Sequence, residues 1–288
     1  MAVALAATDL WAERRRRVGE LRARQGFARQ LLDFYGALLG VQERSFNAAR
    51  DAQPAIESLV AYVAETAFAP VVDVSVAVGP DRLRSDVIRT VRERDACDIV
   101  GAWMRNDDQP MVERFLARAS LGPVLEALGA EARAACDGPR DAQHCPDCGG
   151  PAQLSFSAAS SEGLATGRRF LVCARCAATW GFARMTCAGC GEDSSAKLNI
   201  FSERGTTSGE RGSVVRGLPG SRPAVEDNPV FPHMRIDACD SCRRYLLSVD
   251  LATDPAAVPL VDELAAIPLD LFARERGYTK IIPNLMGF

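Results

Sequence analysis

The chain has 288 residues, of which 48% are hydrophobic and 25% charged, and its formal net charge is -3. This length allows one large or two modest domains with a real core. The balance of charge argues against a general nucleic-acid-binding protein, which usually carries a basic surface. The longest apolar runs are too short to cross a bilayer, and no secretory leader is expected at Met1–Ala7. We therefore expect no membrane insertion and a cytoplasmic location, where thiols stay reduced.

The N-terminal part, residues 1–140, is predicted to be a helical domain. Apolar residues recur at helical spacing along Leu21–Leu39. Pro80 and Pro123 each lie where the first turn of a helix would begin. The alternating stretch Val72–Val78 fits a strand as well as a helix, and its pattern leaves the choice open.

Two features of this half could carry more than packing. An arginine cluster at Arg14–Arg17 is followed by further arginines and interspersed with glutamates. We interpret it as a solvated helix surface rather than a phosphate-binding patch, although a docking surface for an acidic partner stays open. Cys97 and Cys136 have no second cysteine nearby, so both are expected to be buried in the core.

The C-terminal part is organised by four Cys-x-x-Cys pairs, which follow a polar linker at Gly138–Gln143. The pairs hold eight of the ten cysteines. This spacing puts two sulfurs on one tight backbone turn, a knuckle, so that each pair can supply half of a tetrahedral metal site. The pairs are Cys145 with Cys148, Cys173 with Cys176, Cys187 with Cys190, and Cys239 with Cys242.

The four pairs can be grouped into two sites in two ways. In chain order, the first two pairs form site one (Cys145, Cys148, Cys173, Cys176) and the last two form site two (Cys187, Cys190, Cys239, Cys242). In a cross-brace, the first pair joins the third and the second joins the fourth. Short strands are predicted within each half of the set, and this favours chain order, because a hairpin then closes each site. These strands are Gln153–Ser157 and Arg169–Val172, then Lys197–Ser202 and His233–Asp237. A fifth predicted strand, Tyr245–Val249, closes the second ribbon.

Glycine follows the first and third pairs, at Gly149 and Gly191. A left-handed glycine turns backbone N–H groups toward the sulfurs, which helps to hold several thiolates on one ion. The second and fourth pairs have Ala177 and Arg243 instead. His144 and His233 lie near the pairs, but each site already has four sulfurs, so neither histidine is expected to be a ligand.

Three further units complete the predicted organisation. Residues 141–184 and 185–252 form the two ribbons, with Trp180 and Phe182 covering the seam between them and a Gly/Pro-rich loop at 203–228. Residues 253–288 form a C-terminal helix, interrupted near Pro268, and an apolar tail. Such a tail normally needs to be tied down or to contact a partner.

Taken together, these motifs resemble those of the formate dehydrogenase accessory protein family, FdhE. The resemblance rests on the following residues: Cys145-Pro-x-Cys148-Gly149, Cys173-x-x-Cys176 followed by Trp180, Cys187-x-x-Cys190-Gly191, Cys239-x-x-Cys242, Gly277-Tyr278 and Pro283-Asn284-Leu285. It implies an α+β protein, with a helical N-terminal domain followed by two rubredoxin-like, zinc-ribbon-like units. It also implies a cytoplasmic role in maturing or checking formate dehydrogenase before export, through binding of its catalytic subunit.

The site chemistry agrees with a binding factor rather than an enzyme. Four thiolates leave no open coordination position and hence no hydrolytic water. Soft thiolates suit iron or zinc; the resemblance favours iron, and one-electron chemistry stays open. Two other functions are open: a nucleic-acid-binding zinc-ribbon protein, because arginines recur in the ribbon half, and a thiol-redox or sulfur-transfer enzyme, which filled metal sites would oppose. The sequence does not determine the oligomeric state.

Overall fold

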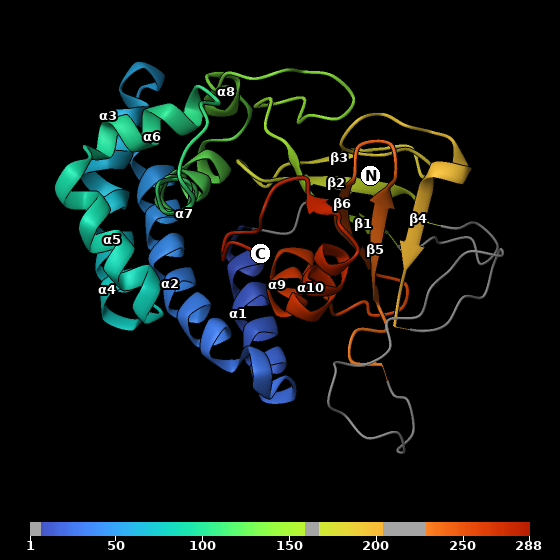
Figure 1. The fold of residues 1–288 in the computed structure, drawn as a ribbon. Coiled ribbons are helices and arrows are strands. Elements are labelled where there is room, and N and C mark those ends of the chain that lie inside the picture. Colours follow the sequence, from blue (N-terminus) through green and yellow to red (C-terminus); the bar gives the residue numbers. More distant parts are fainter. Residues whose placement is uncertain (1–6, 159–166, 204–228) are drawn as a thin grey trace.

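Helices make up the N-terminal half, as predicted. The structure is a computed structural model that describes residues 7–158, 167–203 and 229–288, so most of the predicted loop at 203–228 lies outside the described residues. Helix α2 packs against α1, α4 and α7 at the centre of this half (Figure 1). The helices are α1 (Ala7–Arg24), α2 (Arg29–Ala52), α3 (Leu59–Val63), α4 (Ala69–Val78), α5 (Asp81–Glu93), α6 (Ala96–Met104), α7 (Met111–Leu128) and α8 (Ala130–Ala134).

The ambiguous stretch Val72–Val78 belongs to helix α4. A five-residue π-helical turn at Ala64–Phe68 joins α3 to α4, so that one helical run extends from Ile56 to Val78 and continues through Pro70. By length and composition this run could cross a membrane, although isolated charges interrupt its apolar residues. One such helix is weak evidence for a span, since core helices of other proteins have the same length and composition.

Pro123 was predicted to start a helix, and this prediction is wrong, because Pro123 lies inside α7. Proline has no N–H, so it cannot bond to the carbonyl of Ala119, four residues earlier. The side chain of Gln42 on α2 donates to that carbonyl instead, with an Nε2–O distance of 3.1 Å. A neighbouring helix thus supplies the missing hydrogen bond, and α7 runs on to Leu128.

The arginine cluster on α1 is only partly a solvated surface. Arg14 and Arg17 are buried, whereas Arg15 and Arg16 are exposed. Arg14 pairs with Glu126 of α7, and Arg17 pairs with two aspartates near the C-terminal helices. The expectation of a wholly solvated face was wrong for these two residues, because their carboxylate partners lie far away in the sequence.

The C-terminal half contains one seven-stranded sheet of order β3-β2-β1-β6-β5-β4, with β7 beside β6. All five predicted strands are present; β3 and β7 were not predicted. Pairing is antiparallel except between β1 and β6 and between β6 and β7. The strands are β1 (Ala152–Ser157), β2 (Arg169–Cys173), β3 (Thr179–Gly181), β4 (Leu198–Phe201), β5 (Met234–Cys239), β6 (Arg244–Asp250) and β7 (Thr279–Lys280).

Parallel pairing of β1 with β6 fuses the two predicted ribbons. Leu154 of the first hairpin lies opposite Leu247 of the second. Trp180 and Phe182 pack against a small apolar cluster drawn from both hairpins, as expected of residues at the seam. The buried members of this cluster are Ala152, Leu171, Ala188 and Leu246. The division into separate units at residues 140, 184 and 252 stays a prediction.

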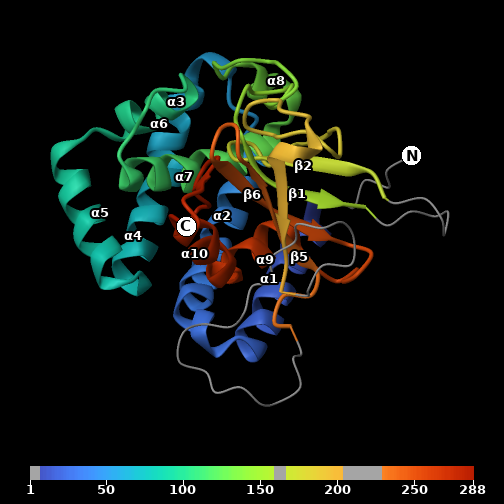
Figure 2. The ribbon, with the colours of Figure 1, turned by 45° about the vertical axis from the view of Figure 1, so that its right-hand side comes forward.

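Two short helices lie between the sheet and the helical half. They are α9 (Pro259–Ala265) and α10 (Ile267–Glu275), separated at Ala266. Helix α9 contacts α1, α2 and β1, and α10 contacts β5 (Figure 2). Phe201 and Phe272 pack edge to face across the α10 contact, with centroids 5.6 Å apart. One apolar core therefore runs from α1 through α9 and α10 into the sheet.

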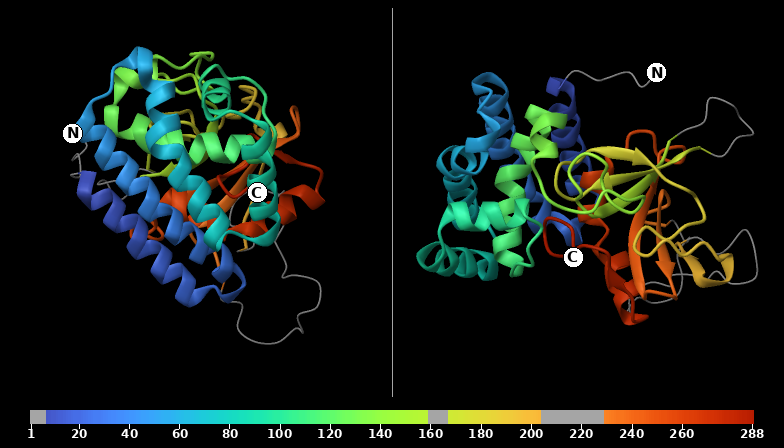
Figure 3. Two further views of the ribbon diagram at one scale, coloured as in Figure 1. Left: turned by 90° about the vertical axis from the view of Figure 1, so that its left-hand side faces the viewer. Right: turned by 90° about the horizontal axis from the view of Figure 1, so that it is seen from above.

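The C-terminal tail is tied down. Lys280 of β7 is buried and pairs with two buried carboxylates, at 2.7 Å from Glu263 and 3.1 Å from Asp270. Arg118 of α7 donates to the carbonyl of Pro283 over 2.7 Å. The tail thus passes from the sheet back to the helical half, where the chain ends (Figure 3).

Candidate metal centres

The cysteines of site one come together at one end of β1 and β2. Their four sulfurs lie within 4.8 Å of one another. Sγ of Cys145 is 3.8 Å from that of Cys176, and Sγ of Cys148 is 3.3 Å from that of Cys173. All four residues are buried. The first pair precedes β1, and the second pair spans the end of β2 and the turn into β3.

Site two is built in the same way at the ends of β4, β5 and β6. Sγ of Cys187 is 3.7 Å from that of Cys242, and Sγ of Cys190 is 3.8 Å from that of Cys239. Cys190 is exposed and Cys242 is half-buried, so this site lies nearer to solvent than site one. The cysteines thus group in chain order, as predicted, and no cross-brace forms.

The sulfur positions fit a tetrahedral ion. With metal–sulfur bonds of about 2.3 Å, the edges of a tetrahedron measure about 3.8 Å. Three of the four sulfur–sulfur contacts match this length, at 3.7–3.8 Å, and the fourth is 3.3 Å. The cysteines are free thiols, with no disulfide between them. Eight cysteine sulfurs could therefore hold two ions, each in a closed four-thiolate site, and which ion they hold is not fixed by this geometry.

The electrostatics of site one favour a bound cation. Burial raises the pKa of the Cys173 thiol well above its ordinary value. Hydrogen bonds from the Cys148, Cys173 and Cys176 thiols lower the pKa of Cys145. Without a cation, only some of these sulfurs could be thiolates and the others would keep protons. A metal ion removes this conflict, because it stabilises all four as thiolates.

The four knuckles share one backbone conformation. The residue after each pair has a positive φ, at +69° for Gly149 and +79° for Gly191, as predicted, but also at +56° for Ala177 and +57° for Arg243. No sequence signal marks this conformation at the two non-glycine positions. At three knuckles the N–H of this residue bonds to the carbonyl of the first cysteine, over 2.9–3.2 Å.

Backbone N–H groups also point at the sulfurs inside the knuckles. The N–H of Gly150 lies 3.4 Å from Sγ of Cys148, and that of Arg175 lies 3.3 Å from Sγ of Cys173. In site two the N–H of Gly189 lies 3.3 Å from Sγ of Cys187. Such contacts stabilise thiolate character and orient the ligands.

Two buried arginines flank site one, and sequence reasoning missed both. Arg118 of α7 donates to the carbonyl of Ala174 over 3.2 Å and to the side chain of Gln153. Arg175 donates to the carbonyl of Cys148 over 2.7 Å. Burial lowers the pKa of Arg118 to about 10. Neither guanidinium pairs with a carboxylate among the described residues, so both bring positive charge to a site that is net negative with a divalent ion.

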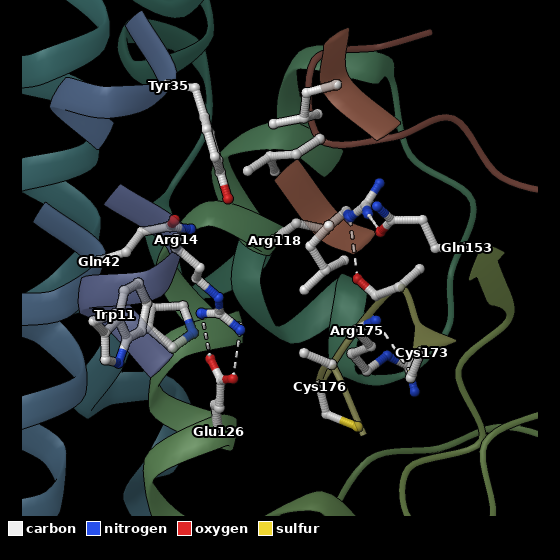
Figure 4. A pocket seen from close by; sticks show the side chains of 17 residues that line it. Trp11, Arg14, Tyr35, Gln42, Arg118, Glu126, Gln153, Cys173, Arg175 and Cys176 are labelled. Atoms are coloured by element: carbon white, nitrogen blue, oxygen red, sulfur yellow. Dashed lines mark hydrogen bonds and ion pairs between the residues drawn. The ribbon is translucent and has the colours of Figure 1, made fainter. Parts of the chain in front are cut away.

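A small cavity separates site one from the helical half. Its volume is about 80 Å³, and Cys173 and Cys176 line one side of it (Figure 4). On the other side Arg14 pairs with Glu126, and the hydroxyl of Tyr35 points inward. Burial raises the pKa of Tyr35 to about 12. Site one is therefore supported by helices as well as by its own hairpin.

The histidines lie outside both sites, as expected. His144 bonds to Asp141 over 2.6 Å, and Nε2 of His233 lies 2.8 Å from Asp262. His233, Asp254 and Asp262 are close enough to bind an ion together. Arg17, however, already pairs with both aspartates, so a guanidinium occupies the position of the cation.

The two remaining cysteines behave differently. Cys136 is buried, as predicted, but Cys97 is exposed, so that prediction was wrong. Cys97 lies in the first turn of α6, where its N–H bonds to the capping carboxylate of Asp95 over 2.7 Å. The buried face of that helix is formed by other residues, including Ile99 and Trp103.

A helical half joined to a sheet that carries two closed four-cysteine centres defines a metal-binding α+β protein. A family model described as "FdhE, C-terminal domain" matches residues 224–286. The chain is 24% identical over 225 residues to a protein FdhE homolog of Aquifex aeolicus, an alignment covering 77% of this chain and 69% of that protein. The chain is thus similar to FdhE proteins in sequence and in fold.

Other relatives match over part of their length. A protein FdhE homolog of Pseudomonas putida is 32% identical over 142 residues, which cover 49% of this chain but 37% of that protein. The crystal structure of the FdhE protein from Pseudomonas aeruginosa superposes on this chain with a TM-score of 0.58 at 22% sequence identity. The superposition covers 97% of this chain and 96% of the Pseudomonas aeruginosa chain. The fold described above is therefore the fold of that protein.

Proposed function

We propose that this chain is a cytoplasmic accessory factor that binds the catalytic subunit of formate dehydrogenase and assists its maturation or quality control before export. Similarity to FdhE proteins supports this role. The observation that carries the proposal is the convergence of all eight paired sulfurs into two closed centres on one sheet. Closed centres fold and stiffen a surface, and they offer no coordination position at which a substrate could react.

We further propose that the eight paired cysteines are metal ligands and that the ions are iron, with zinc as the alternative. Four soft thiolates in a tetrahedron suit either metal. Ferric iron held by four thiolates absorbs visible light, whereas zinc does not, so an absorption spectrum with metal analysis distinguishes the two. Convergence of the pairs also disfavours a free dithiol enzyme, since thiolates bound to an ion cannot attack a disulfide.

Partner binding is tested by titrating the purified, metal-loaded chain with the purified catalytic subunit in reducing buffer. A one-to-one complex in size-exclusion chromatography and calorimetry is the expected result. The matched control is the same chain with Cys187→Ser and Cys190→Ser, which cannot complete site two. If the loaded protein forms no complex at micromolar concentrations, the proposed role is wrong.

A further inference from the structure

A cleft of about 350 Å³ opens beside site two. It lies on the face of the sheet that α10 does not cover. Successive side chains of a strand point to opposite faces, and on β4 Phe201 packs against α10 whereas Leu198 and Ile200 line the cleft. The contacts described above between the sheet and the helical half lie on the other face.

Hydrogen bonds from a buried side chain hold one wall of the cleft in place. Arg169 of β2 is buried, and its guanidinium donates to the carbonyls of Ala183 and Thr186, at 3.2 and 2.9 Å. These bonds fix the segment that forms one wall. Cys187 of that wall and Cys239 at the end of β5 both line the cleft, so the ion of site two would tie the two walls together.

The charge of the cleft is opposite to that of the whole chain. Four arginines and one aspartate line it, in a protein of net charge -3. The aspartate, Asp237, is shared between Arg169 at 3.1 Å and Arg235 at 2.9 Å. Arg244 is exposed and has no ion-pair partner in the part of the chain that the structure describes. Positive charge is therefore left to attract a carboxylate.

Exposed apolar side chains lie at the rim of the same cleft. Met185 is 49% exposed and Ile200 is 45% exposed, and both line it. An apolar contact next to the guanidinium of Arg244 suits a polypeptide that carries carboxylates and apolar side chains. Nucleic acid would use the charge but would leave both apolar residues in water.

We infer that this cleft is a docking site for an extended acidic segment of the partner protein. In this arrangement a carboxylate of the segment pairs with Arg244, and an apolar side chain packs between Met185 and Ile200. The inference rests on the proposed function for the identity of the partner, the catalytic subunit. The ion of site two then supports binding by holding the cleft in shape, without touching the partner.

The test measures the affinity of the full, metal-loaded chain for the catalytic subunit in two cleft variants, Arg244→Glu and Ile200→Glu. Each is expected to weaken binding at least tenfold, because Arg244→Glu repels the docking carboxylate and Ile200→Glu puts a charge where an apolar side chain packs. Arg92→Glu and Val78→Glu are the matched controls. They make the same changes at exposed positions outside the cleft, and their affinities should stay within twofold of the unaltered chain. Metal analysis of every variant shows that both sites are intact.

A labelled decapeptide of alternating glutamate and leucine provides a second arm. If the unaltered chain binds this probe through Arg244 and Ile200 but does not bind the catalytic subunit, the cleft inference stands and the proposed partner is wrong. If it binds the catalytic subunit equally well with and without the cleft changes, the inference is wrong and the proposed function stands. Binding of random single-stranded RNA in place of the probe, or a dimer that Ile200→Glu dissociates, would also overturn it.

Discussion

The residue that follows each Cys-x-x-Cys pair adopts a left-handed backbone whether or not it is glycine. A side chain in this conformation costs roughly 1–2 kcal/mol. At Arg243 the cost is offset in part, since its guanidinium lies 4.0 Å from the ring centroid of Tyr278. Ala177 has only a methyl group and gains no comparable contact. The knuckle of site one that carries Ala177 therefore holds local strain that the Gly149 knuckle avoids.

Replacing Ala177 with glycine should stabilise the metal-loaded protein by about 1 kcal/mol, because glycine adopts positive φ without steric cost. Guanidinium unfolding, followed by near-UV circular dichroism, measures the change in the free energy of unfolding.

Two matched substitutions should lower the free energy of unfolding instead of raising it. Gly149→Ala should destabilise the protein by roughly 1 kcal/mol or more, because φ is positive at this position and the new Cβ would lie 2.7 Å from the carbonyl carbon of Gly138. Ala178→Gly, at a residue without positive φ, should destabilise by about 0.5–1 kcal/mol. A stability of Ala177→Gly equal to or below that of the unaltered chain would show that the knuckle is not strained.

The paired cysteines and the residues that support them differ in how far the sequence revealed them. Each pair lies within four residues, so spacing alone identified all eight cysteines that the structure brings together. Arg118 donates a hydrogen bond to the second knuckle, although the two lie 56 positions apart in the chain. A long-range contact of this kind leaves no local pattern, and Arg118 alone looks like any other helical arginine.

At the scale of elements, helix α7 depends on a hydrogen bond from another helix. Gln42 bonds to the carbonyl of Ala119 that Pro123 cannot reach. Both the carbonyl and the amide lie in the core between α2 and α7, so a missing partner would leave a buried polar group unsatisfied. The usual cost of such a group is about 1–3 kcal/mol.

A double-mutant cycle tests this dependence. Gln42→Leu alone should destabilise the protein by about 1–3 kcal/mol, since the carbonyl of Ala119 loses its donor. In a Pro123→Ala background the same change should be less destabilising, because the new N–H at position 123 bonds to that carbonyl. Additive effects in thermal unfolding, without a coupling energy of at least about 0.5 kcal/mol, would contradict this account.

In the sheet, too, the sequence predicts local pairing but not pairing between distant segments. The five strands predicted from alternation and turn residues are present, because hairpin pairing joins neighbours in sequence. Strand β3 has three residues and β7 has two, which is too short for a recognisable pattern. The parallel contact of β1 with β6 depends on packing between distant segments, so the sequence predicted two ribbons where the structure has one continuous sheet.

At the scale of the whole molecule, the two metal centres differ in their surroundings. The four cysteines of site one belong to the same apolar core as the helices, whereas Cys190 of site two is exposed. Loss of an ion from site one should therefore disturb the entire fold. Loss from site two should disturb mainly β4, β5 and the cleft beside them.

A chelator should remove the two ions in two phases. The fast phase, from site two, should leave the near-UV spectrum of the helical half largely unchanged, while the slow phase should accompany global unfolding. Cys190→Ser should abolish the fast phase and lower the metal content from two ions to one per chain. Release of both ions at one rate, or survival of the fold after both are gone, would be inconsistent with this arrangement.

The parallel pair of β1 and β6 also imposes an order on synthesis of the chain. All ligands of site one have been made once Cys176 leaves the ribosome, so its ion can bind early. Strand β1 must then wait for β6, which ends at Asp250. At about 5–20 residues per second, this leaves an open strand edge for several seconds. Nascent chains stalled before Arg244 should thus be the form of this protein most prone to aggregate.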